Sequence, residues 1–322
     1  MAGEMLWSTQ SGYLTNNKLN KTIQRVAQPL FRFRQYVTIR EAFGKQVGES
    51  VNWLKVANVG TYGGSLLETN TMSETTQALT WGTLSVTEYG NSIPFTAKIE
   101  SLSQFDIQDI VRRGLMDDMV KVIDGVVERE FNETVLRYVG TSTTGGAVTT
   151  NGTATATNTS ILNTYHVRKM VTQLKARNVP GFKSLGGDYV FIVSVEAAEN
   201  IRGALESVYQ YVDKGVGLIM DGEIGRYYGV RFVEDTFASR FTFSASARTA
   251  TAKSWSGGQS LDGYLFGEDT VREAIVVPEE IRMKVITDYG RSKGIAWYNL
   301  GGWQIEWADE PNARIIKWDS AA

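Results

Sequence analysis

The sequence predicts an α+β fold in which one long helix is set between extended, strand-like segments. The helix prediction rests on residues 104–138, where apolar residues recur at intervals of three and four and form one stripe. At the rise of an α-helix, these 35 residues would span roughly 50 Å. The strand prediction rests on residues 49–100 and on the last fifth of the chain, where apolar and polar residues alternate. A helix of that length is better suited to join parts or subunits than to line a pocket.

Composition excludes several kinds of chemistry. The chain has 322 residues, 42% hydrophobic and 21% charged, which is typical of a folded protein of one or two domains. It contains no cysteine, which excludes disulfides, thiolate nucleophiles and cysteine metal sites. His166 is the single histidine, and its place near the start of a predicted helix favours a surface or capping role over catalysis. We expect no cofactor, no metal and no enzymatic activity.

Charge is unevenly distributed. The net charge is −2, but residues 1–45 carry seven basic and two acidic side chains, a local net charge of +5. This segment is either a solvated basic helix face or an arm that touches an anionic polymer without sequence specificity. No run of about 18 apolar residues is present, so no membrane span is expected. The first residues lack the basic and apolar regions of a signal peptide, so secretion is not expected either.

The first hundred residues are predicted to be mostly extended. A short helix at 18–28 ends at Pro29, because proline cannot donate to the helix ladder. A strand at 51–59 and a strand pair at 79–99 follow, with a bulge or turn at Gly90-Asn91 where the alternation changes parity. An isolated hairpin is only marginally stable in water. Since no partner strand lies nearby in the chain, a neighbouring subunit would have to pack against this two-stranded segment.

The remaining segments predict a mixed unit followed by strands. We expect Ser103 to cap the long helix and the Gly/Thr-rich residues 140–159 to form a surface loop or a hairpin. A second Ser/Ala/Thr-rich insertion is expected at 242–258. The other predicted elements are helices at 165–177 and 196–205 and strands at 189–195, 228–232, 264–266, 274–277, 282–289, 295–307 and 315–316.

Catalytic motifs are absent from the sequence. It has no phosphate-binding loop and no Gly-x-Ser-x-Gly elbow. The pair Gly301-Gly302 fits a turn, and Glu128-Arg-Glu130 fits a solvated helix face. The neighbouring carboxylates Asp117 and Asp118 diverge on a helix and cannot share one acid/base task. Tryptophans in the strand-rich end are best explained by core or subunit packing.

The order of these parts resembles the major capsid proteins of tailed bacteriophages, which share the Hong Kong 97-type capsid fold. The stretches Leu84-Ser-Val-Thr-Glu-Tyr-Gly-Asn-Ser-Ile-Pro-Phe-Thr96 and Gly222-Glu-Ile-Gly-Arg-Tyr-Tyr-Gly-Val-Arg-Phe-Val-Glu234 are similar to those of the N4-like phage subgroup. Tyr264-Leu-Phe-Gly267 and Gly301-Gly-Trp303 fall where that subgroup has its late strands. The likeness is collinear over most of the chain.

This resemblance implies a domain layout and a role. It implies a major capsid protein that self-assembles into pentamers and hexamers of an icosahedral head around double-stranded DNA. Implied partners are a scaffolding protein, a portal protein, DNA bound without specificity, and a cement or decoration protein. The location would be the virion capsid, assembled in the host bacterial cytoplasm. The implied parts are an N-terminal arm (1–48), an extended β-hairpin loop (49–100), a peripheral domain with the long spine helix (101–139) and terminal strands (267–322), and an axial domain (140–266).

The resemblance also assigns contact residues. Inter-subunit contacts of the extended loop would be Trp53, Lys55, Leu66, Leu67 and Glu68. Basic residues that would face packaged DNA or a neighbour's acidic patch are Lys18, Lys21, Arg25, Arg32 and Arg34. Some capsids of this fold join neighbours through a lysine–asparagine isopeptide bond, but Lys55 lies near the base of the hairpin, and we do not expect that bond here.

Two other functions remain open at this point. An encapsulin-like compartment shell would share the fold but enclose cargo proteins, and the N4-like stretches argue against it. An enzyme or sugar-binding module at 160–267 would need a pocket with converging polar groups. Particle formation and the particle contents distinguish the three.

Overall fold

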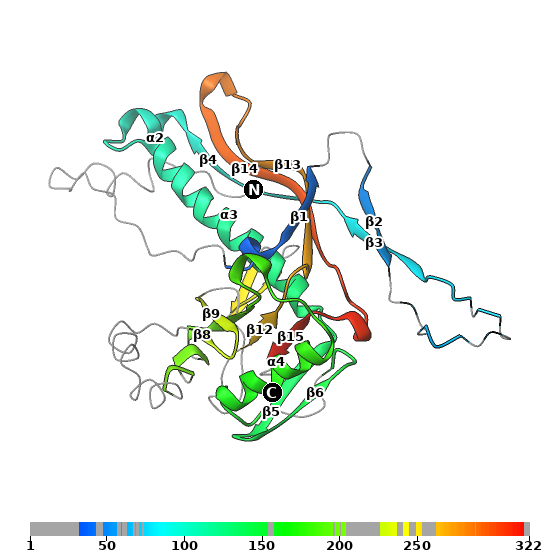
Figure 1. Cartoon of the computed structure of the whole chain (residues 1–322). Helices are drawn as coiled ribbons and strands as arrows, with labels where there is room; N and C mark the ends of the chain where they lie inside the picture. The colour runs from blue at the N-terminus through cyan, green and yellow to red at the C-terminus, as the bar shows by residue number, and fades with distance from the viewer. Residues whose placement is uncertain are drawn as a thin grey trace.

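The structure is a computed structural model of the chain, and it describes residues 32–42, 48–56, 79–153, 158–195, 226–236, 241–244, 249–252, 262–286 and 288–318, with parts of 59–78 and 197–203. The predicted helix at 18–28 and residues 222–225 of the capsid-like stretch lie outside this part. Two large sheets share one long helix, and a two-stranded hairpin stands away from both (Figure 1). No helix within the described ranges is long and apolar enough to cross a membrane.

The larger sheet has seven strands in the order β6-β5-β15-β12-β7-β9-β8. Two neighbouring pairs, β15 with β5 and β7 with β9, are parallel, and the others are antiparallel. All six residues of β7 are buried, which explains why its sequence is an unbroken apolar run instead of an alternating one. The strands are β5 (Leu136–Ser142), β6 (Gly145–Thr149), β7 (Tyr189–Ser194), β8 (Arg226–Tyr227), β9 (Val230–Asp235), β12 (Gly263–Phe266) and β15 (Ile315–Trp318).

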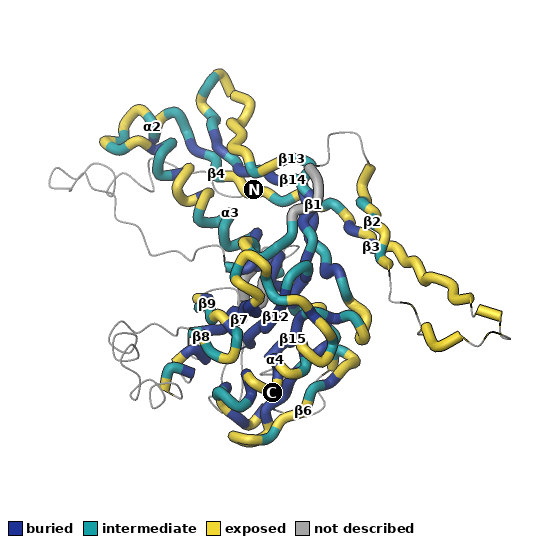
Figure 2. Tube along the Cα trace, viewed as in Figure 1, coloured by how far each residue is buried: buried dark blue, intermediate teal, exposed yellow. Residues whose placement is uncertain are grey.

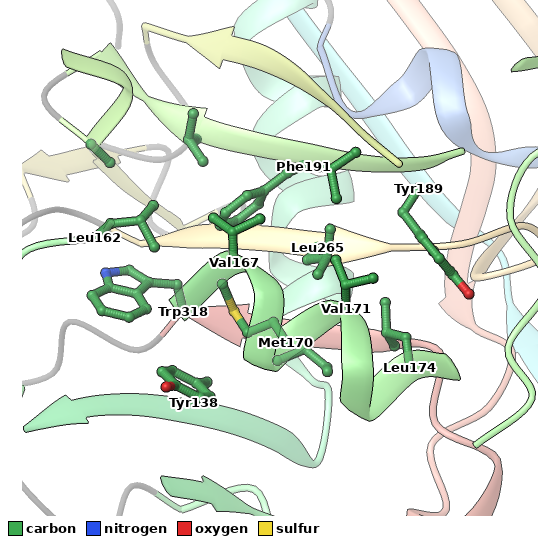
Figure 3. Close-up of a cluster of buried hydrophobic side chains, with 14 of the residues drawn as sticks. Tyr138, Leu162, Val167, Met170, Val171, Leu174, Tyr189, Phe191, Leu265 and Trp318 are labelled. Carbon is green, nitrogen blue, oxygen red and sulfur yellow. The ribbon is translucent and has the colours of Figure 1, made fainter. Parts of the chain in front are cut away.

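Helices cover both faces of this sheet. On one face, α4 (Thr164–Ala176) contributes Met170 and Leu174 to a core that includes Phe191 and Trp318 (Figure 3). On the other face, the C-terminal half of α3 (Ile107–Asn132) packs against the alternate residues of β7. The two faces of β7 therefore lie in two different hydrophobic cores.

The smaller sheet has the order β1-β13-β14-β4 and packs on the N-terminal half of α3. Its strands are β1 (Thr38–Ala42), β4 (Thr87–Thr96), β13 (Val271–Met283) and β14 (Ser292–Ile305). The Asp118 carboxylate on α3 accepts hydrogen bonds from Trp297 Nε1 (2.9 Å) and Asn91 Nδ2 (3.0 Å). β4 pairs with β14 as far as Ser292, and the β13–β14 ribbon ends in a loop at the top of Figure 1.

The remaining elements are short. They are 3₁₀ turns η1 (Arg34–Tyr36), η2 (Lys183–Leu185), η3 (Asp288–Gly290) and η4 (Glu310–Asn312), helix α2 (Ala97–Leu102), and the paired strands β2 (Ser50–Val56) with β3 (Leu79–Ser85) and β10 (Phe241–Ser244) with β11 (Thr249–Ala252). Both Ser/Thr-rich segments expected as insertions thus contain short hairpins, β5–β6 and β10–β11.

The long helix is confirmed, but it is shorter than predicted. It has 26 residues, about 39 Å, instead of 35. Asp106 is its N-cap, with the carboxylate accepting from the backbone N–H of Gln108 (2.9 Å) and Asp109 (3.3 Å). The expected cap, Ser103, ends α2 instead. At the other end the chain leaves for β5, and Thr134 Oγ1 donates to Ile315 O (2.6 Å).

Part of the predicted extended loop (49–100) belongs to the smaller sheet. The expected break at Gly90-Asn91 is wrong, because β4 pairs with β14 in unbroken register there. The interruption lies at Val86, between β3 and β4. Residues 87–96 therefore pair with a strand of their own chain, β14. Because β14 lies far later in the sequence, the residues around 87–96 did not indicate this pairing. Of the predicted extended loop, only β2 and β3 lie outside both large sheets in the described part of the chain.

Three predictions for individual residues are wrong for one physical reason, namely packing by distant segments. Gly301 and Gly302 lie within strand β14 and not in a turn. Glu128 and Glu130, expected on a solvated face, are buried. His166, expected at the surface or as a cap, has no exposed area, and Asn163 caps α4. The tryptophan prediction is confirmed, since Trp297, Trp303 and Trp318 are buried.

Candidate assembly surface

The β2–β3 hairpin carries two faces of different character. Residues directly opposite in an antiparallel pair point to the same face. The outward face contains the polar cross-strand pairs Ser50–Ser85 and Asn52–Thr83 and the apolar pairs Leu54–Trp81 and Val56–Leu79. The inward face contains Val51–Leu84, Trp53–Gly82 and Lys55–Thr80. Alternation along β2 is regular, with every second residue exposed.

The inward face fixes the hairpin to the body. The Trp53 ring lies across Gly82, where an added Cβ would come within 2.3 Å of the ring. The guanidinium of Arg272 on β13 lies 4.8 Å from the Trp53 ring centre, and Lys55 Nζ lies 5.6 Å from that of Trp307. These distances allow cation–π attraction. Burial lowers the pKa of Lys55, although nearby carboxylates partly offset that effect.

Four residues of the outward face form an apolar surface that has no cover among the described residues. Exposed fractions are 48% for Leu54, 55% for Val56, 57% for Leu79 and 70% for Trp81. Figure 2 shows the hairpin as a mostly exposed limb beside a largely buried body. We call these four residues the hairpin face. A contiguous apolar face of this kind is typical of a protein interaction site.

The hairpin leaves the body at a tight crossing. Leu84, near the end of β3, is fully buried against the body. A Cβ at Gly302 would meet Ser85 O at 2.4 Å and Leu84 Cδ2 at 2.6 Å. Only glycine lets β14 pass this close to the root of the hairpin.

A second exposed apolar surface lies at the end of the β13–β14 ribbon. Sequence reasoning missed it because residues 282–289 were predicted as strand, whereas β13 ends at Met283. Asp288, Tyr289 and Gly290 all have positive φ, and the Tyr289 side chain is fully exposed. The Asp-Tyr-Gly sequence was the available turn signal. We call this surface the ribbon tip, and its exposed apolar residues are Ile281, Met283, Val285, Ile286 and Tyr289.

The predicted contact residues of the loop fall into two groups. Trp53 and Lys55 face the body of their own subunit, not outward. Leu66 and Glu68 are exposed. Leu67 lies outside the described residues. The prediction missed Leu54 and Trp81, which strand alternation from Trp53 would have assigned to the outer face.

Of the predicted basic residues, Lys18, Lys21 and Arg25 lie outside the described part of the chain. Arg32 is half-buried. Arg34 is directed into its own subunit, where its guanidinium pairs with Glu273 (2.8 Å) and Glu279 (2.5 Å) on β13. Burial lowers the pKa of Arg34, but Glu273 and Glu279 together raise it by more, so the net shift is upward. An arginine engaged in this way is not directed toward DNA.

The single histidine belongs to a buried hydrogen-bond network. His166 Nδ1 lies 3.0 Å from Tyr138 OH, and Nε2 lies 3.2 Å from Ser160 Oγ. Burial lowers the pKa of His166 to about 4 and raises the pKa of Tyr138 to about 12. A neutral imidazole that accepts from the tyrosine and donates to the serine satisfies all three groups. Buried as it is, this network is structural.

Over nearly its full length, the chain is similar in structure to several solved phage capsids. Cyanophage Pam1 capsid protein is 15% identical, with 100% of both chains covered and a TM-score of 0.65. The Helicobacter pylori bacteriophage KHP30 capsid is 13% identical over 99% of both chains, with a TM-score of 0.67. The capsid of cyanophage P-SCSP1u is 13% identical, with 97% of this chain and 94% of that chain covered and a TM-score of 0.67.

The chain has the Hong Kong 97-type capsid fold. No protein-family model matches the sequence, and no curated protein matches it either. The predicted fold class is therefore confirmed by structure alone. These matches do not test the narrower likeness to N4-like phages, which stays a prediction.

Proposed function

We propose that this chain is the major capsid protein of a tailed bacteriophage and assembles into the pentamers and hexamers of an icosahedral head. The observation that carries the proposal is the hairpin face, which is exposed on a chain that matches phage capsid structures from end to end. An apolar face that the described part of its own chain leaves exposed offers its surface to another molecule of the same kind. Repeated contacts between copies then close into rings and a shell.

The driving force of assembly is burial of this apolar surface. Each Å² of apolar surface removed from water contributes about 25 cal/mol. Inward contacts of Trp53 and Lys55 hold the hairpin in place before association, so less conformational entropy is lost on binding. The ribbon tip supplies a second contact surface on the same subunit.

The proposed domain layout follows the two sheets, so several boundaries move: β1 leaves the arm, β4 leaves the loop, and β5 and β15 join the axial domain. The N-terminal arm then ends before β1, which begins at Thr38, and the extended loop ends near Val86 instead of residue 100. The smaller sheet and α3 form the peripheral domain, and the seven-stranded sheet with α4 forms the axial domain. The packing of α3 across both sheets supports its role as the spine that joins them.

Further partners belong to the same proposal. A scaffolding protein and a portal protein would guide assembly in the bacterial cytoplasm, and a cement protein would bind the finished shell. Double-stranded DNA would fill the head, with the basic N-terminal arm as the nonspecific contact. Arg34 is removed from that set because it is paired with Glu273 and Glu279.

The direct test is imaging of the full chain expressed with the scaffolding protein of the same phage. We expect closed, uniform shells in negative-stain micrographs. Heads from infected cells should contain double-stranded DNA, whereas a compartment shell would contain protein cargo. A protein that stays monomeric with and without the scaffolding protein would contradict the proposal.

A further inference from the structure

Two arginines share one buried carboxylate at the β8–β9 edge of the seven-stranded sheet. Arg226 Nη2 lies 2.5 Å from Asp188 Oδ1, and Arg231 Nε lies 3.1 Å from Asp188 Oδ2. The two arginines are directly opposite each other in the β8–β9 pair. Like charges in that position destabilise a sheet, and one carboxylate offsets only one of them. This edge therefore keeps an excess of positive charge.

The two guanidinium groups are open to water, although their shared partner is not. The exposed fractions of the side chains are 62% for Arg226 and 49% for Arg231, against 2% for Asp188. Arg231 Nη2 also donates to Leu185 O on η2 (3.3 Å). These contacts use one N–H group of Arg226 and two of Arg231, out of five in each side chain. Donors therefore remain for a further acceptor.

Two more cations border these arginines. Lys183 is exposed on η2, the same turn whose Leu185 carbonyl accepts from Arg231. Arg32 is half-buried and lies near Tyr36. Burial raises the pKa of Tyr36, and the charges of Arg32 and Arg231 both act against that rise, so both guanidinium groups are close to its ring.

The carboxylates on this side of the sheet are covered. Strand alternation places Asp235 on the same face of β9 as Arg231, and Asp235 is fully buried. Asp124 on α3, which accepts from the backbone N–H groups of residues 32–34, is buried as well. The surface therefore presents its cations to water and not its carboxylates. We call its four basic residues, Arg32, Lys183, Arg226 and Arg231, the basic edge.

The basic edge continues the charge of the N-terminal arm. Residues 1–31 carry three basic side chains and one acidic side chain, and Arg32 follows them directly in the sequence. An anion that contacts both the arm and the basic edge has to carry charge along its length. Double-stranded DNA does so, with one phosphate charge about every 1.7 Å of its axis. This continuity favours a nucleic acid over a single acidic patch of a protein.

We propose that the basic edge binds phosphate groups of double-stranded DNA without reading its sequence. The planar fork of an arginine matches two oxygens of one phosphate, and Arg226 and Arg231 place two such forks side by side. Contacts to phosphates contain no information about the bases. The identity of the partner rests on the proposed function, in which DNA fills the head.

The test is the salt dependence of DNA binding by the full-length subunit. Fluorescence anisotropy of a labelled double-stranded DNA fragment gives the association constant K over a series of KCl concentrations. Each phosphate contact contributes about 0.9 to the steepness of log K plotted against log salt. Arg226→Gln combined with Arg231→Gln should reduce the steepness by about 1–2. This variant leaves Asp188 buried without its arginines, so urea unfolding is measured to check that it folds.

A second variant keeps Asp188 paired. Arg32→Gln combined with Lys183→Gln removes two cations that form no ion pair with a described residue, so the fold should be unaffected. Its plot should also be less steep by about 1–2. The matched control is Arg113→Gln combined with Arg282→Gln, two exposed arginines on α3 and β13. The control should keep the steepness of the wild type.

Three results would overturn the inference. The first is wild-type steepness in the Arg32/Lys183 variant and in the folded Arg226/Arg231 variant. The second is an equal loss in the control, which would mean that net charge alone determines binding. The third is displacement of the labelled DNA by polyglutamate as effectively as by unlabelled DNA, which would indicate an acidic protein segment as the partner. Shells that form from subunits whose basic edge does not bind DNA would contradict this inference and leave the proposed function intact.

Discussion

At Gly302 the backbone of β14 runs so close to the end of β3 that a single methyl group does not fit. We predict that Gly302→Ala lowers the free energy of unfolding by about 1–3 kcal/mol, because the nearest atom is the backbone oxygen of Ser85, which cannot rotate away. Urea unfolding of the subunit measures this change.

Gly114 provides the matched control. It lies on the exposed side of α3, and an added Cβ there would meet nothing within 4 Å. Gly114→Ala should therefore stabilise the subunit by up to about 1 kcal/mol, as expected for a helix interior. If both substitutions had the same effect, the close crossing at Gly302 would not be a constraint.

His166 makes the subunit sensitive to acid. Its pKa falls from 6.5 to about 4 on folding, so its contribution to stability is present above 6.5 and is lost as pH falls toward 4. We predict a loss of about 2–3 kcal/mol between pH 7 and pH 4.5. His166→Gln should be less stable at pH 7 but should show a smaller loss over the same range in urea unfolding. An equal loss in both proteins would mean that other groups cause the acid sensitivity.

The surroundings of individual charged residues were not predictable from the local sequence. Arg34 was expected to face DNA or a neighbour, and it is instead paired with Glu273, which lies 239 positions away in the sequence. Glu128, expected in solvent, accepts from Tyr264 OH at 2.5 Å. A charge pattern on one helix face indicates solvent only when no distant segment covers that face, and local spacing contains no information about distant segments.

Among the elements, the hairpin has two faces that should respond differently to substitution. Replacing Leu54 and Trp81 with Gln should change the unfolding free energy of the subunit by less than about 0.5 kcal/mol, because both side chains are already exposed. The same variant should give few or no shells in the micrographs. Replacing Trp53 with Gln should instead destabilise the subunit, because it removes the contacts with Gly82 and Arg272. Shell yields at the wild-type level from the Leu54/Trp81 variant would contradict the assigned role of the hairpin face.

Elements with strong periodicity were predictable, and long-range strand pairing was not. Helix α4, strand β7 and strand β15 lie within one or two residues of their predicted bounds, because buried residues recur along each of them in a clear pattern. The partner of β4 is β14, some two hundred residues later, so the sequence near β4 contains no sign of it. The predicted length of α3 was too great because the apolar spacing continues past Asn132 into strand β5.

For the molecule as a whole, the sequence predicted the architecture better than the contacts. The order of arm, hairpin, long helix, mixed unit and late strands indicated a capsid fold, and the structural matches over nearly the full length confirm it. The hairpin face could have been located by extending the alternation of β2. The ribbon tip could not, since its exposure depends on which distant segments pack against the end of β13 and β14.

The central claim is that a second copy of this chain covers the hairpin face. Val56→Cys introduces the only thiol of the chain on that face, where the native side chain is 55% exposed. We predict that this thiol reacts readily with a maleimide in the free subunit, at least about tenfold more slowly in assembled shells, and fully once the shells are dissolved in urea. Equal reactivity in subunits and intact shells would contradict the account.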